Sequence, residues 1–198
     1  RSASLYLTKT IYSTILAILF VFTNDPYPFV PIQTTLTGAL TIGIPSFILA
    51  MEPNVNRVSG SFLKNILRMA IPGGLLVVLA VTATEIFGNL FEMSNFGVST
   101  LAAYALFIAS ATELFKVCRP FNRLRTAMFV TLLEIFFLCS TIFCSFFNFV
   151  PLIRTNNIVF VLLLIPACSV FYGIFDLIAE KILGTTPAVL LFSTSSNP

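Results

Sequence analysis

The sequence predicts an all-α membrane protein, a polytopic bundle of six transmembrane helices. Hydrophobic residues make up 57% of the chain and charged residues only 10%, whereas a soluble chain carries roughly a quarter charged residues. The mean hydropathy is +0.97. The apolar residues also fall into six stretches, each near the roughly 20 residues that a helix needs to cross a bilayer. The lipid bilayer is therefore the first expected partner of this chain.

Turn signals and polar loops separate the six predicted spans. One signal at residues 24–26 ends the first span, and another at 52–54 ends the second. Pro72 is expected in the first turn of the third span, where proline is tolerated, after a polar loop at 55–69. The predicted spans are 5–23, 29–51, 70–91, 98–115, 127–147 and 158–178, and they form one membrane domain, 1–178. A cytoplasmic tail, 179–198, ends in a polar run that is typical of disorder.

The distribution of basic residues predicts the orientation. Lysine and arginine are concentrated in the loops 55–69 and 116–126, whereas the loops on the other side hold only Arg154. By the positive-inside rule both termini are cytoplasmic. The net charge of +3 therefore reflects topology, and nothing in it suggests binding to nucleic acid.

The composition disfavours catalysis and metal binding within this chain. There is no histidine, which removes the commonest general base and the commonest metal ligand. The cysteines Cys118, Cys139, Cys144 and Cys168 are expected to pack as small apolar residues, and their spacing matches neither a redox pair nor a zinc motif. We expect no catalytic residue, no disulfide, no confidently assigned metal site and no cofactor held by this chain.

The second span carries a polar face and an internal proline. Gln33, Thr37 and Thr41 recur at steps of four, so a helix places them on one face, with Thr34 beside it. Pro45 lacks the amide N–H and its ring clashes with the carbonyl of Thr41, so we expect the helix to kink or unwind there. Such a helix is either part of a transport path or a structural kink whose threonines bond their own backbone.

Ionisable residues within the spans are functional candidates, because burying a charge in lipid is costly. Lys9 shares a face with Tyr12 and Ser13 in the first span. This face serves either coupling or the ion path. The alternative, which we favour for Lys9, is a lysine whose long side chain snorkels to the membrane interface. Glu85 and Glu134 are expected to face the bundle interior, as stations for a proton or ion or, more simply, as hydrogen-bonded packing groups.

Two further acids lie near the predicted cytoplasmic ends of their spans. Glu113 can pair with Lys116 three residues later on the same helix, and Asp176 precedes Glu180 by one turn. We interpret Glu113 and Asp176 as interfacial pairs or caps. The acids lie at different depths, so we do not expect them to converge on one cation.

The segments RSASLYLTKTIYSTILAILF and YPFVPIQTTLTGALTIGIPSFILAMEPN resemble the fifth and sixth transmembrane helices of bacterial cation-translocating P-type ATPases. The resemblance continues through NRVSGSFLKNILRMAIPGG and, more loosely, through the other four spans. It implies that the six spans are the last six of the ten helices of such a pump. The location it implies is the bacterial plasma membrane.

The resemblance also implies partners that this chain does not contain. Pumps of this family use ATP and Mg²⁺ in cytoplasmic domains that carry a DKTG motif, and this chain has none. The expected partners are therefore the missing N-terminal part of the same polypeptide and the transported cation. Where calcium and sodium–potassium pumps place acidic or amide ligands, three and seven residues before Pro45, this chain has Ile42 and Gly38. Coordination by carboxylates is thus not expected on this helix.

The resemblance and the residues together favour the transport portion of an ATP-driven P-type cation pump. Gln33, Thr34, Thr37 and Thr41 would line the path, and Pro45 would break the helix that moves. The alternative is a stand-alone six-span scaffold or secondary carrier. A membrane enzyme is a distant third, because no nucleophile–base pair is visible. The chain opens with Arg1, so we expect a piece of a longer polypeptide.

Overall fold

The computed structural model describes residues 2–23, 28–52, 62–150 and 157–183. These residues form helices joined by short connections, and none of them lies in a strand. Six helical segments within the described ranges are long and apolar enough to cross a membrane. The predicted fold class, an all-α polytopic bundle with six spans, is therefore confirmed.

The first two spans differ in regularity. Helix α1, Ser2–Thr23, is continuous, whereas the second span consists of α2, Pro31–Gly38, a π-helical turn η1, Ala39–Gly43, and α3, Ile44–Met51. The remaining elements are α4, Phe62–Leu90; α5, Asn95–Val117; α6, Arg123–Thr141; the short α7, Cys144–Phe147; and α8, Asn157–Leu183.

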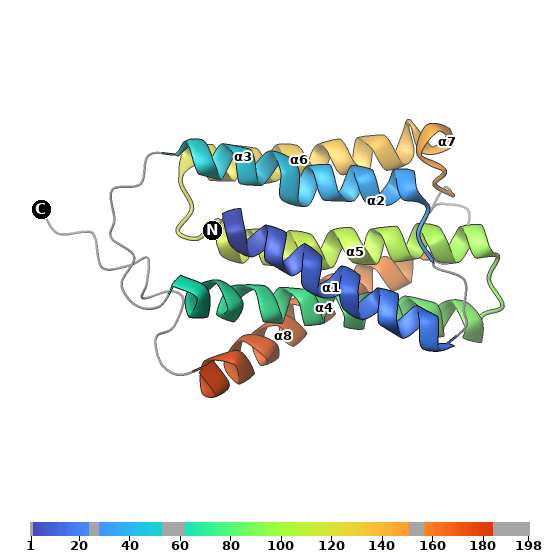
Figure 1. Cartoon of the computed structure of the whole chain (residues 1–198). Helices are drawn as coiled ribbons and strands as arrows, with labels where there is room; N and C mark the ends of the chain where they lie inside the picture. Colours follow the sequence, from blue (N-terminus) through green and yellow to red (C-terminus); the bar gives the residue numbers. More distant parts are fainter. Residues whose placement is uncertain (1, 24–27, 53–61, 151–156, 184–198) are drawn as a thin grey trace, which may run out of the picture.

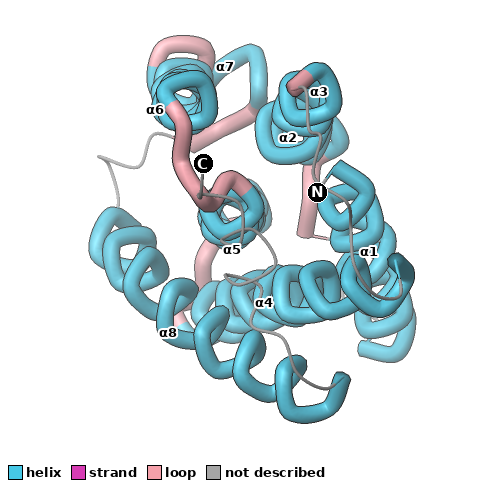
Figure 2. Tube along the Cα trace, turned by 90° about the vertical axis from the view of Figure 1, so that its left-hand side faces the viewer, coloured by secondary structure: helices cyan, strands magenta, loops and turns pink. Residues whose placement is uncertain are grey.

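Helix α5 lies at the centre of the bundle and is buried along most of its length. Figure 2 shows α2, α3 and α6 on one side of α5 and α4 and α8 on the other, with α1 beside α4. Helix α4 contacts α1, α5 and α8. In Figure 1 the start of α1, the end of α3 and the start of α4 lie at one end of the bundle, and the turn between α4 and α5 lies at the other.

Helix α6 is attached to the central helix by aromatic packing. The ring of Phe136 stacks on Phe107 of α5 with centroids 3.6 Å apart, and it meets the edge of Tyr104 at 5.3 Å. Phe149, after α7, packs edge-on against both Tyr104 and Phe136. Because offset and edge-to-face pairs are favourable beyond the area they bury, this cluster fixes the position of α6.

Three predicted boundaries are wrong. Helix α4 begins at Phe62, so the loop predicted at 55–69 is helical from there on, and Pro72 lies inside the helix rather than in its first turn. The fifth span ends at Thr141, and α7 follows as a separate helix that is closed by Asn148 in the left-handed conformation, φ 57°. Helix α8 includes residues 179–183, which were assigned to the tail. Hydropathy locates the apolar segment but not the capping groups that end a helix, and residues 184–198 lie outside the described ranges.

Candidate functional site

The polar face predicted on the second span is buried inside the bundle. Gln33, Thr37 and Thr41 are 0%, 1% and 2% exposed, although all three side chains are polar. Thr34 lies beside this face and is half-buried, and its hydroxyl donates to the carbonyl of Pro31 at 2.9 Å. Burying polar groups is costly unless they find partners, so the partners of the three buried side chains define what this face can do.

Both polar atoms of the Gln33 amide are hydrogen-bonded to other elements. Its Nε2 donates to the carbonyl of Asn148 at 2.8 Å, and its Oε1 accepts from the hydroxyl of Ser99 at 2.9 Å. These bonds connect α2 to α5 and to the residue that closes α7. Neither Ser99 nor Asn148 was predicted, because both are more than 60 residues away in sequence. Gln33 therefore acts as a structural clamp at this end of the polar face.

The two threonine hydroxyls differ in their bonding. Thr41 Oγ1 donates to the carbonyl of Thr37 at 2.8 Å, which is the local backbone bond of the structural alternative. Thr37 Oγ1 is buried and has no hydrogen-bond partner. Most buried polar side-chain atoms are bonded, so the unbonded hydroxyl of Thr37 is an exception on this face.

Pro45 changes the winding of the helix without breaking it. The backbone N–H of Ile44 bonds to the carbonyl of Ala39, five residues back, and Gly43 keeps helical angles of φ −60° and ψ −64°. A π turn places one extra residue in the helix. This extra residue accommodates the proline ring and its missing donor, so the helix is locally widened just before Pro45.

The π turn brings a further hydroxyl onto the polar face. With one extra residue in the turn, the position that follows Thr41 on the same face is Ser46 rather than Pro45. Ser46 is 3% exposed, and its Oγ is buried without a hydrogen-bond partner. Steps of four along the sequence do not predict Ser46, because they assume a regular α-helix throughout. The two unpartnered hydroxyls, on Thr37 and Ser46, therefore flank the π turn.

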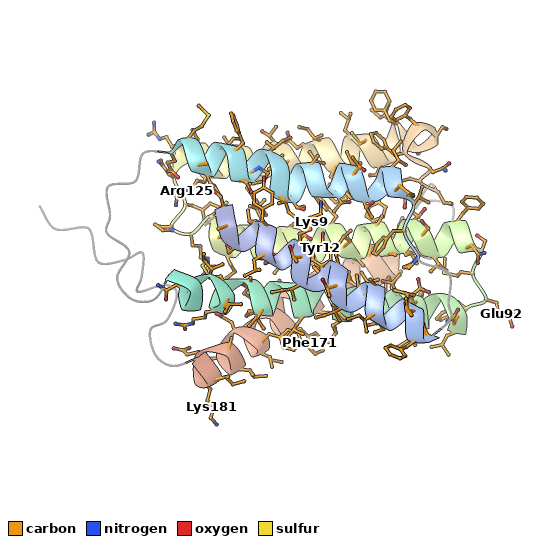
Figure 3. The ribbon with its side chains drawn as sticks, in the orientation of Figure 1. Lys9, Tyr12, Glu92, Arg125, Phe171 and Lys181 are labelled. Atoms are coloured by element: carbon orange, nitrogen blue, oxygen red, sulfur yellow. The ribbon has the colours of Figure 1, made fainter. Side chains whose placement is uncertain are left out.

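The three candidates on α1 have different surroundings. The ammonium of Lys9 reaches toward α2, and its Nζ lies 3.5 Å from the point where a Cβ on Gly38 would stand. The ammonium therefore lies beside the start of the π turn, at a distance that would be an ordinary contact even for an alanine at position 38. Tyr12 is buried in the apolar core and Ser13 is half-buried. Figure 3 labels Lys9 and Tyr12 on α1, well inside the length of the bundle.

Glu113 lies in a different environment from the one predicted. Its side chain is 2% exposed, and its Oε1 accepts from the hydroxyl of Thr8 on α1 at 2.5 Å. A methyl group on Gly73 of α4 would lie 2.5 Å from the Cδ of Glu113, so the carboxyl group rests on bare backbone. Lys116 is 3.8 Å from Asp176. The predicted pairing of Glu113 with Lys116 is wrong, because α1 and α4 enclose the acid, whereas Asp176 does form an ion pair, with Lys116.

The last two candidate acids, Glu134 and Glu85, lie in different surroundings. Glu134 is exposed on α6, so within this chain the prediction that it faces the interior is wrong; α6 carries apolar residues all round and gives no face to assign. Glu85 is half-buried and lines a cavity of about 310 Å³ together with Ser99. Among the described residues no group of three or more His, Cys, Asp or Glu side chains is placed to hold a metal ion.

Comparison with known proteins gives the family context. No family model and no solved structure matches the chain. It is 32% identical over 136 residues to the "Probable cation-transporting ATPase exp7" of Streptococcus pneumoniae, which covers 65% of this chain and 18% of that protein. It is 35% identical over 136 residues to the "Calcium-transporting ATPase CtpE" of Mycolicibacterium smegmatis, covering 62% and 17%. The protein of the same description from Mycobacterium bovis is 32% identical over 142 residues, covering 65% and 18%.

The chain is a homologue of cation-transporting P-type ATPases. The aligned part is about 17% to 18% of the length of these relatives. Together with six apolar helices, this coverage fits the transmembrane transport portion of a P-type ATPase.

Proposed function

We propose that this chain forms part of the ion pathway of an ATP-driven cation pump, and that the cation passes along the polar face of α2, η1 and α3. The observation that carries the proposal is the pair of buried, unpartnered hydroxyls on Thr37 and Ser46. Leaving a buried polar group unbonded costs about 1–3 kcal/mol, so these positions favour a state in which a ligand binds there.

The chemistry of the face is that of neutral oxygen ligands. Thr37 and Ser46 supply hydroxyls on either side of the π turn, and Pro45 offers no N–H to the carbonyl of Thr41. Membrane helices whose regular α-helical bonding is interrupted, and which present such oxygens, are a common form of cation site. Two of the relatives are named calcium-transporting, so Ca²⁺ is the first cation to test. Since Ca²⁺ takes six to eight oxygen ligands, the remaining ligands would come from other helices or water.

ATP hydrolysis is assigned to other parts of the full-length pump. The relatives are named ATPases, which supports ATP and Mg²⁺ as requirements of that longer protein. No residue of this chain is assigned to nucleotide binding. We propose Lys9, Tyr12 and Ser13 as coupling positions, because α1 contacts both η1 and α3 and the Lys9 ammonium lies beside the π turn.

The proposed orientation places both termini in the cytoplasm of a bacterium. Basic residues at one end of the bundle support it. They include Arg125 and Lys181, which Figure 3 shows opposite the end that carries Glu92. An impermeant thiol reagent should label Lys181→Cys from the cytoplasmic side only. Labelling of Lys181→Cys in intact cells from outside would show that the orientation is the opposite one.

Measurements of Ca²⁺ transport and of protein stability together test whether the cation follows this face. In the full-length protein in sealed vesicles, Thr37→Val and Ser46→Ala should each lower ATP-dependent Ca²⁺ uptake about tenfold, which corresponds to about 1.4 kcal/mol. Neither change should lower the thermal midpoint, because each replaces an unbonded buried hydroxyl by an apolar group. Thr35→Val is the matched control, since its hydroxyl is exposed and bonded to Pro31. Unchanged uptake in both variants would show that the cation takes another route.

A further inference from the structure

A cavity of about 310 Å³ lies where α4 ends and α5 begins. It is at the end of the bundle opposite the start of α1, beside the turn that joins the two helices in Figure 1. Four polar residues line it: Glu85, Asn89, Asn95 and Ser99. The cavity is distinct from the polar face of the second span, and none of the residues described as lining it is a lysine or an arginine.

The lining offers the donor set of a hard cation. A carboxylate, two side-chain amides and a hydroxyl supply oxygen ligands, which Ca²⁺ and similar ions prefer. One water occupies about 30 Å³ of liquid, so the volume holds about ten waters. There is room for a cation that keeps part of its hydration shell.

The charge in this cavity comes mainly from Glu85. The last turn of α4 presents its carbonyl end, which favours a cation, while the first turn of α5 presents its positive end. These two contributions oppose one another, so the carboxylate decides the sign. With a single carboxylate ligand the expected dissociation constant is in the weak range, about 10⁻⁴ to 10⁻³ M.

The cavity lies next to the polar face of the second span. Ser99 lines the cavity and donates to Gln33, the first residue of that face. A cation leaving the face at this end would therefore meet the cavity next, and weak binding suits a station from which an ion must depart.

We propose that this cavity binds a partly hydrated divalent cation through Glu85, assisted by Asn89 and Asn95. Its role as a terminal station rests on the proposed function, but binding itself requires no turnover. A measurement at equilibrium therefore separates failure of the site from failure of the transport path.

Sensitised terbium luminescence tests the site in the full-length protein. This chain has no tryptophan, and Phe96 lines the cavity and is 63% exposed, so Phe96→Trp places a donor there. Emission from Tb³⁺ that depends on this substitution reports an ion in the cavity. With Tb³⁺ kept well below its own dissociation constant, Ca²⁺ should displace it with a midpoint of about 0.1–1 mM. Emission of the unsubstituted protein is subtracted as background.

Charge variants decide whether Glu85 is the ligand. Glu85→Gln should weaken Tb³⁺ binding at least tenfold, and Asn89→Asp, which adds a carboxylate at an exposed position, should strengthen it. Glu92→Gln is the matched control, because Glu92 lies in the same turn region but does not line the cavity. Absence of emission dependent on the new tryptophan, or equal affinity in Glu85→Gln and Asn89→Asp, would overturn the proposal. The Asn89→Asp arm remains informative even where Glu85→Gln impairs folding.

Discussion

The guanidinium of Arg125 at the start of α6 binds the carboxylate of Glu52 just after α3. Its Nε and Nη2 lie 2.8 and 2.6 Å from the same oxygen, Oε2. The remaining nitrogen, Nη1, donates to the carbonyls of Pro120 at 2.8 Å and Cys118 at 3.3 Å. One side chain thus ties the end of the second span to the connection between α5 and α6, and both partners are largely buried, with side chains 11% and 21% exposed.

Removing this tie should destabilise the bundle. Arg125→Gln leaves Glu52 and two carbonyls without their donor, and hydrogen bonds to charged groups contribute about 1.5–3 kcal/mol each. We expect the free energy of unfolding to fall by about 2–3 kcal/mol. Thermal unfolding can be followed through the reactivity of the thiols of Cys118 and Cys168, which are buried in the folded state.

The pair of Lys116 and Asp176 is the matched control. Its atoms are 3.8 Å apart and both side chains are about a third exposed, so Lys116→Gln should cost less than about 1 kcal/mol. Equal losses in the two variants would show that Arg125 has no special structural role.

Close packing of Glu113 on Gly73 makes a second prediction. Gly73→Ala inserts a methyl group 2.5 Å from the Cδ of Glu113, and overpacking of this kind costs about 1–3 kcal/mol. In the double variant Gly73→Ala/Glu113→Ala the loss should be smaller than the sum of the two single losses, because the clash is gone. A double-mutant cycle on the unfolding free energy measures this coupling.

Gly173 in α8 provides the control for helix propensity. A Cβ there would meet nothing within 4 Å, so Gly173→Ala should be neutral or stabilise the protein by about 0.5–1 kcal/mol. Additive effects at Gly73 and Glu113 would contradict the contact between them.

The aromatic cluster predicts unequal effects of two neighbouring phenylalanines. Phe136 is 0% exposed and stacks on Phe107, so Phe136→Ala should lower the unfolding free energy by about 3–5 kcal/mol. Phe137 is 46% exposed, and its replacement by alanine should have a much smaller effect. The thermal midpoints of the two purified variants measure this difference. Similar decreases in both midpoints would show that α6 is held by other contacts.

Pro45 is predicted to maintain the π turn. In Pro45→Ala the normal N–H returns, and the N–H of Ile44 should bond four residues back, to Leu40, instead of five, to Ala39. Losing one residue from the turn rotates Ser46 by about 100° relative to Thr37, which removes it from the polar face. A structure of the variant shows the bond directly, and Ca²⁺ uptake should fall as in Ser46→Ala.

Thr41 is the comparison for this prediction, because its hydroxyl already has a backbone partner. Thr41→Ala should therefore affect uptake less than Thr37→Val. If Pro45→Ala loses the π turn and both Pro45→Ala and Thr41→Ala still transport Ca²⁺ fully, the path does not run along this helix.

Hydropathy predicted the six spans because length and apolarity are local properties of the sequence. The buried face of Gln33, Thr37 and Thr41 followed from helical period, which also failed at the π turn and so missed Ser46. The environment of Glu113 could not be predicted, because Thr8 and Gly73 come from two other helices. The interior position predicted for Glu134 rested on the cost of a charge in lipid, and α6 has no amphipathic pattern from which its face could be read.

Lys9 and Glu85 give the candidate route an electrical polarity. The ammonium stands beside Gly38 at the π turn, and the carboxylate lines the cavity near Gln33 at the opposite end of α2. A cation moving from the turn toward the cavity therefore travels down a potential gradient built into the helices, and one moving the other way climbs it. Lys9→Met should flatten this gradient, which a change in the Ca²⁺ dependence of ATP-driven uptake would report. The two charges thus set where along the candidate route a cation rests, whereas a fixed internal potential cannot by itself set the direction of net transport.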